Sequence, residues 1–158
     1  MSIALRIRAV LADRVADIRA ADGYATDMGL CVLDSRAEPA AADLALGPAV
    51  SVRLGGEEAV ERQGGQLRLS RDVRVIGWSL AGDDPEATAE ALLADIKRAV
   101  LRPAEPALTD AAGRIGQQLE YARADLDLPE PGEVLVTVEA TFTARYFEAY
   151  GNPAAAAA

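Results

Sequence analysis

The chain has 158 residues, of which 51% are hydrophobic and 26% are charged, and its formal net charge is −9. This length fits a single domain, and the composition lies outside the range of disordered chains. The acidic balance argues against a reader of duplex DNA, because such proteins neutralise phosphates with Lys and Arg. The chain contains no histidine and a single cysteine, Cys31. These counts exclude His-dependent nucleophilic sites, His-ligated zinc and an internal disulfide.

The N-terminal residues lack the features of a secretory signal. Arg6 and Arg8 interrupt the first apolar stretch, so there is no continuous apolar core. No apolar run approaches the roughly 20 residues of a membrane span. We therefore expect a soluble protein of the cytoplasm that has no contact with membranes. Its single domain is expected to cover residues 1–153, and the alanine run 154–158 is expected to be disordered.

Two amphipathic helices are predicted. Apolar residues recur every three or four positions from Ile3 to Ile18, which is typical of a helix with one buried face. The second helix is predicted over Asp84–Leu101, because Asp84 suits an N-cap and Pro85 suits the first helical position. Each helix has one apolar stripe, so each is expected to pack on a sheet.

Most of the remaining chain alternates apolar and polar residues, as strands do. The predicted strands are Leu30–Leu33, Ala49–Leu54, Gln66–Leu80 with a bend near Ser70–Asp72, Gln117–Leu126 and Glu133–Tyr146. Gly55-Gly56 and Gly64-Gly65 are expected to bracket the tip of a long hairpin, and residues 37–48 to form a loop. This order predicts an α+β fold, a mostly antiparallel β-sheet with a long hairpin and two α-helices packed on one face.

The polar clusters that could carry chemistry have simpler structural explanations. Asp83–Asp84 is interpreted as a helix cap and Glu57–Glu58 as solvated charge, since neither pair has a nucleophile or third ligand nearby. The acidic stretch 125–133 resembles a calcium loop only loosely. Cys31 and Trp78 are expected in the core. We therefore expect no catalytic activity, no metal and no cofactor.

Two elements favour contacts with other proteins. The long hairpin projects charge away from a small domain, and the polar face of strand Glu133–Tyr146 is rich in threonine. Such surfaces can accept a strand or helix of a neighbour. The candidate interface residues on these elements are Glu57, Glu58, Glu61, Arg62, Arg68, Thr141, Thr143 and Arg145.

The order of these motifs resembles that of phage tail terminator proteins. The resemblance rests on the opening helix with the turn 23–29 (Gly-Tyr-Ala-Thr-Asp-Met-Gly), the long paired strands, the capped helix from Asp84-Pro85-Glu86, and the closing strand with the segment 150–153 (Tyr-Gly-Asn-Pro). It covers nearly the whole chain, and residues 37–48 depart from it. It implies a virion subunit that forms a homohexameric ring at the head-proximal end of a phage tail, where the ring stops polymerisation of the tail tube.

The resemblance also implies the partners. They are further copies of this chain, the tail tube protein, and the head connector or stopper protein, brought together in the host cytoplasm. DNA would pass through the ring without specific binding, and the negative charge of the subunit would repel its phosphates. Two other functions stay open: another head–tail joining subunit (tail completion or stopper), and a small-molecule-binding α+β domain. The lack of histidine and the 4% content of aromatic residues weigh against the last.

Overall fold

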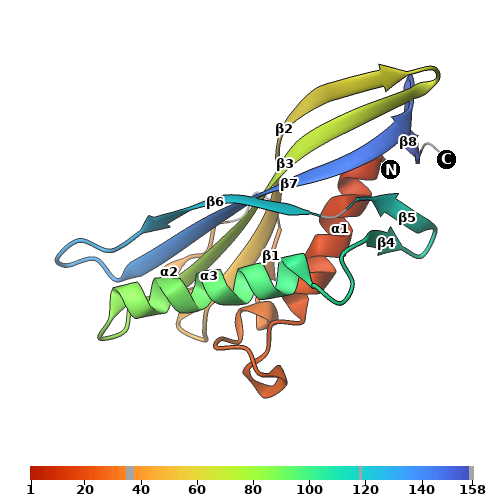
Figure 1. The fold of residues 1–158 in the computed structure, drawn as a ribbon. Helices are drawn as coiled ribbons and strands as arrows, with labels where there is room; N and C mark the ends of the chain where they lie inside the picture. Colours follow the sequence, from red (N-terminus) through yellow and green to blue (C-terminus); the bar gives the residue numbers. More distant parts are fainter. Residues whose placement is uncertain (35–37, 118, 157–158) are drawn as a thin grey trace.

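The computed structural model describes residues 1–34, 38–117 and 119–156, and it has two layers, a sheet and a pair of helices (Figure 1). The sheet order is β1 (Val32–Leu33), β2 (Ala49–Gln63), β3 (Gln66–Leu80), β7 (Leu135–Ala149) and β6 (Glu120–Asp127). Strand β8 (Asn152–Ala156) pairs with the end of β7, while β4 (Leu108–Asp110) and β5 (Gly113–Gly116) form a separate hairpin. Only β1 with β2 is parallel among these pairs of described strands. The predicted α+β class is confirmed.

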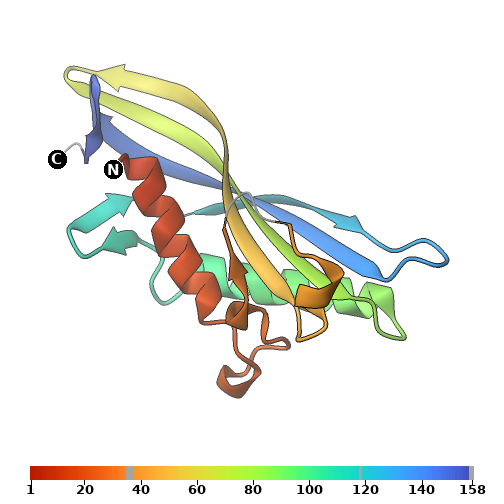
Figure 2. The ribbon, with the colours of Figure 1, turned by 180° about the vertical axis from the view of Figure 1, so that it is seen from behind.

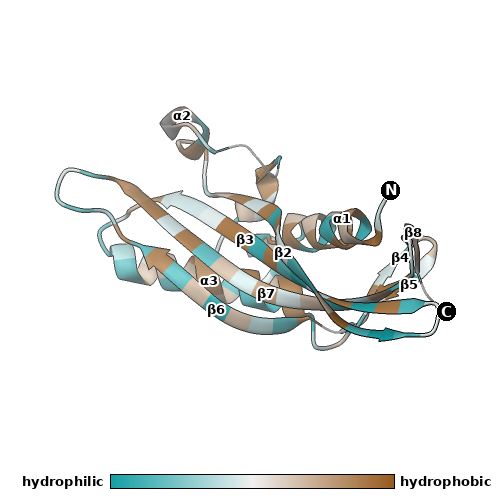
Figure 3. Ribbon diagram, turned by 90° about the horizontal axis from the view of Figure 1, so that it is seen from above, coloured by the Kyte–Doolittle hydropathy of each residue, from teal (hydrophilic) through white to brown (hydrophobic). Residues whose placement is uncertain are grey.

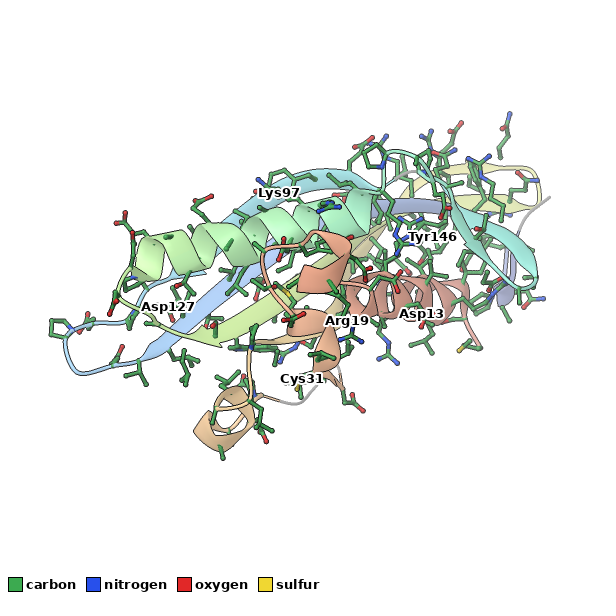
Figure 4. The ribbon with its side chains drawn as sticks, turned by 90° about the horizontal axis from the view of Figure 1, so that it is seen from below. Asp13, Arg19, Cys31, Lys97, Asp127 and Tyr146 are labelled. Carbon is green, nitrogen blue, oxygen red and sulfur yellow. The ribbon has the colours of Figure 1, made fainter. Side chains whose placement is uncertain are left out.

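Helices α1 (Ile3–Ala16) and α3 (Pro85–Leu101) lie over the same face of the sheet (Figure 4). The Ser2 hydroxyl accepts a hydrogen bond from the Leu5 N–H at 3.4 Å and begins α1. The Asp84 carboxylate accepts one from the Ala87 N–H at 3.0 Å and begins α3. Side-chain caps of this kind satisfy N–H groups that have no partner within the helix. Helix α3 therefore has the cap that the sequence predicts, and α1 begins at Ile3, where its apolar spacing starts.

The main core lies between these two helices and the sheet. It contains the apolar stripe of each helix and the inward residues of the long strands, among them Ile7, Leu11, Leu92, Ile96 and Phe142, each at most 1% exposed. Because side chains alternate along a strand, the inward set of β7 runs Val136, Val138, Ala140, Phe142, Ala144 and Tyr146. The sequence predicted this inward set and also placed Val134 in it. Val134 does not belong to the set, because it lies before the start of the strand and is 59% exposed.

A smaller cluster packs on the opposite face of the sheet. Ile76 and Trp78 of β3 are buried there with Ala49 and with Leu44 of a short helix, α2 (Ala41–Leu44). The helix lies inside the segment predicted as a loop. Trp78 is a core residue as expected, whereas Cys31 is half-buried at the margin of this cluster. Two short 3₁₀ turns, η1 (Ala20–Asp22) and η2 (Met28–Leu30), precede β1, so the first predicted strand begins at Val32 and not at Leu30.

The tip of the long hairpin is shorter than predicted. Strand β2 continues to Gln63, so the turn consists of Gly64-Gly65 alone. Gly55 and Gly56 instead form a bulge opposite Asp72, at the predicted bend of β3. A Cβ atom on Gly55 would lie 2.9 Å from the Cβ of Asp72, so the close approach of the two strands requires glycine at this position.

The segment after β7 also differs from its prediction. Residues 154–156 belong to β8, although the alanine run was expected to be disordered; residues 157–158 lie outside the described residues. Strand β8 pairs with β7 through Glu148 and Ala149. Pairing of the backbone does not depend on side chains, so even an alanine run can add a strand. No described helix is long and apolar enough to span a bilayer.

Candidate interaction surfaces

The outer part of the β2–β3 hairpin, residues 56–70, forms an arm that projects beyond the helices (Figures 1 and 2). Every residue from Gly56 to Gly65 is exposed. The end of β7 runs beside β3 as a third strand, with Tyr146 opposite Leu69 and Ala149 opposite Gln66. The Tyr150 N–H donates to the Gly65 carbonyl at 2.8 Å. The arm is therefore a supported ribbon and not an isolated loop.

Glu57 is held at the root of this arm by internal contacts. Arg71 Nη1 donates to Glu57 Oε2 at 2.8 Å, and the Tyr146 hydroxyl donates to the same oxygen. Burial raises the pKa of Tyr146, and the Glu57 carboxylate raises it further. Burial also raises the pKa of Glu148, with a smaller contribution from Glu57. Glu57, predicted as solvated charge, thus belongs to a network that joins three strands.

The remaining charges of the arm lie closer to its tip. The guanidinium of Arg62 stacks on the ring of Tyr150 at 3.8 Å. Arg68 lies 3.9 Å from Glu61 and 5.9 Å from the ring of Phe147. Ion pairs at this exposure contribute little to stability. These side chains can therefore change partner at small cost.

The face of the sheet away from α1 and α3, which we call the outer face, is turned toward the viewer in Figure 3, and strand register places rows of charged residues across it. Arg53, Arg74, Thr141 and Arg123 stand in register as one row. Carboxylates occupy the neighbouring rows, and Arg74 reaches Glu139 at 3.5 Å while Arg145 reaches Glu120 at 3.0 Å. A striped surface of this kind orients a partner more than it holds one.

Two hydroxyls on the outer face are buried without a hydrogen bond. Thr141 is 4% exposed and Ser51 is 0% exposed, and neither side-chain oxygen has a partner among the described residues. Most buried polar atoms in folded proteins are paired. Both oxygens are covered by neighbouring side chains, so their lack of a partner is a cost inside the sheet and does not mark a surface site.

The structure divides the predicted interface residues between two faces. Strand register places six of these residues on the outer face. The other two, Glu57 and Arg62, lie on the opposite face, which α1 and α3 cover closer to the centre of the sheet. The six are Glu58, Glu61, Arg68, Thr141, Thr143 and Arg145. The hairpin and the closing strand, predicted as separate contact elements, thus contribute to one continuous surface.

Sequence reasoning missed two buried charges that hold loops in place. Asp95 of α3, 4% exposed, accepts hydrogen bonds from the Ala25 N–H at 3.0 Å and from the Thr26 N–H and hydroxyl at 2.8 Å. Arg14 of α1, 6% exposed, donates to the carbonyls of Val100, Glu105 and Ala107. In the sequence, each of these charged residues lies beside the apolar stripe of its helix. That position is the signal from which its burial could have been predicted.

The described residues offer little for chemistry. They contain no group of three or more Cys, Asp or Glu residues able to hold a metal ion. An open hollow of about 360 Å³ beside α2 is lined by Leu30, Cys31, Leu46, Gly47 and Pro48, together with Asp27 and Asp43. Two carboxylates at the rim of an open apolar hollow do not form a set of convergent groups.

No protein-family model matches the chain, and no curated protein matches it. A solved structure does share its fold. A chain of the "Virion of native gene transfer agent (GTA) particle" matches 91% of this chain and 90% of its own length, with a TM-score of 0.50 and 22% sequence identity. At this identity the likeness establishes a common fold, and it extends over nearly the whole of both chains.

Proposed function

We propose that this chain is a structural subunit of a phage-like virion and that it acts as a tail terminator. The observation that carries the proposal is the fold it shares, over nine-tenths of each chain, with a chain of a gene transfer agent virion. In this role, six copies form a ring at the head-proximal end of the tail. The ring stops polymerisation of the tail tube and presents a surface to the head connector or stopper protein.

The shape of the subunit supports ring formation. A ring requires two different patches on one subunit that meet around an axis. The arm and the outer face provide one patch, and strand β6, at the far edge of the sheet, provides the other. A stable contact buries about 800 Å² on each partner, and the arm together with the end of β7, lying on a neighbour, can supply such an area.

The distribution of charge supports the same role. DNA passes through the ring of a terminator. The net charge of −9 on each subunit would repel the DNA phosphates and so disfavour binding of the DNA to the ring. Exposed carboxylates on the arm, Glu58 and Glu61, would orient the subunit on its neighbour or on the tube.

The first test is the mass of the purified chain in solution, followed by electron microscopy with tail tubes. We expect a hexamer and density at one end of each tube. The double variant Glu58→Lys with Glu61→Lys is expected to fold but to fail in assembly, whereas Asp13→Lys with Asp22→Lys, equally exposed but on the α1 side, is expected to assemble normally. A chain that stays monomeric and does not bind tubes would overturn the proposal. Density on the head vertex alone would assign the chain to another head–tail joining subunit.

A further inference from the structure

The end of the molecule opposite the arm is a second distinct surface, which we call the acidic end. It consists of the β3–α3 connection, the first turn of α3 and the β6–β7 connection (Figure 1). Leu80 pairs with Leu135 across β3 and β7, and the Ala81 N–H donates to the Val134 carbonyl at 2.7 Å. These contacts place the two connections side by side, so they present one surface.

Five large apolar side chains are exposed at this end. Leu80, Leu126, Leu128, Val134 and Leu135 are between 36% and 59% exposed. Leu80 and Leu135 lie on the outer face and Leu126 on the face of α3, so exposed apolar side chains lie on both faces of the sheet at this end. Single exposed leucines are ordinary, but a group of them on adjacent strand ends marks a contact site.

The charged residues in the segments that carry these apolar side chains are all acidic. The sequence contains no Lys or Arg at positions 75–96 or 124–144. The carboxylates of the two connections are Asp83, Asp84, Glu86, Asp127, Glu130 and Glu133. None of these carboxylates forms a salt bridge within the described residues. The arm, in contrast, carries both signs, with Glu61 near Arg68.

We propose that the acidic end binds a basic segment of a different protein, one that also carries apolar side chains. Contact with the leucines would supply most of the affinity, and the carboxylates would select for Lys and Arg. A second copy of this chain fits less well, because its net charge is −9 and its two most exposed leucines, Leu30 and Leu46, lie around a hollow with Asp27 and Asp43. That contact would bring like charges together. The inference goes beyond the proposed function, since it concerns the isolated subunit and requires neither a ring nor a tail.

The test uses the full chain and a fluorescent helical peptide of leucine and lysine, with a leucine–glutamate peptide of the same length as its control. Fluorescence anisotropy is expected to show binding of the lysine peptide that weakens as salt rises, and binding of the glutamate peptide that is weaker by about tenfold or more. Leu128→Ser with Val134→Ser is expected to abolish binding. Leu30→Ser with Leu46→Ser, a matched pair at another exposed site, is expected to leave it unchanged.

A second variant, Glu130→Gln with Glu133→Gln, keeps the test decisive if the serine variant does not fold. It is expected to weaken binding and to reduce its salt dependence. Equal losses from both serine pairs, or unchanged binding in the acidic-end variants, would overturn the proposal. So would a loss of self-association in Leu128→Ser with Val134→Ser, because the occupant would then be a second copy.

Discussion

The base of the molecule and its arm are built from the same strands but are held by different forces. In the base, α1 and α3 cover the sheet, and the side chains between them are almost completely excluded from water. In the arm, strands β2 and β3 extend beyond the helices, and residues 56–65 are exposed on both faces. The same two strands therefore pass from a region stabilised by apolar burial to one stabilised by backbone pairing and a few polar contacts.

This difference separates stability from recognition. Burial of apolar surface is the dominant favourable term in folding, so the base determines whether the chain is folded. The arm buries little and exposes charge, so its residues are available to a partner. Changes in the base should therefore act on stability, and changes at the arm tip should act on assembly.

The largest expected effect tests the base. Phe142 is fully buried and packs edge-on against Tyr121 at 5.7 Å between ring centroids. Phe142→Ala should lower the free energy of unfolding by about 3–5 kcal/mol. Val60→Ala, at a 53% exposed arm position, should change it by about 0.5 kcal/mol or less. Urea denaturation measures both values, and similar losses would contradict the division into base and arm.

The second effect concerns the buried guanidinium of the base. Arg14→Met would leave the carbonyls of Val100, Glu105 and Ala107 without their donor. We expect a loss of about 1–3 kcal/mol, as is typical when buried polar groups lose their partner. Hydrogen exchange should also become faster in the loop 102–107. The exposed control, Arg114→Met, should leave exchange in that loop unchanged.

A smaller effect is expected at the junction of base and arm. Tyr146→Phe removes the hydroxyl that donates to Glu57 and should cost about 1 kcal/mol at neutral pH. Because the folded state raises the pKa of Tyr146, the contribution of this phenol is complete below its ordinary pKa of about 10 and is lost as pH rises through the folded value. Wild type should therefore lose more stability in alkali than the variant. Tyr121→Phe, at a 39% exposed tyrosine, serves as the control, and an unchanged alkaline loss in Tyr146→Phe would contradict the assignment.

The smallest effect is expected at Glu148, on the part of β7 that lies beside the arm. The folded state raises the pKa of Glu148 through burial and through Glu57, so ionisation of this carboxyl as pH rises works against folding. Glu148→Gln should therefore give a slight gain in thermal stability at neutral pH, which disappears in acid. Most of the group is solvated, so the gain should be small. A loss of stability in this variant would show that the carboxylate contributes a favourable contact.

The sequence by itself determined the two long helices and the faces that the long helices and strands bury. Periods of three to four residues predicted α1 and α3, and a period of two predicted the inward set of β7, because one buried face repeats at the period of the backbone. The cap at Asp84 was predicted for the same local reason, since a cap acts within one turn of the chain. These features depend on residues close together in sequence.

Only the tertiary structure decided how distant segments meet. Sequence could not assign Gly55-Gly56 to a bulge, because that depends on Asp72 of the next strand. Asp95 and Thr26, or Arg14 and Glu105, are far apart in the chain and are joined only by packing. The acidic end also arises in this way. Its leucines are unremarkable in their own segments, and they form one surface because strand pairing places Leu80 beside Leu135.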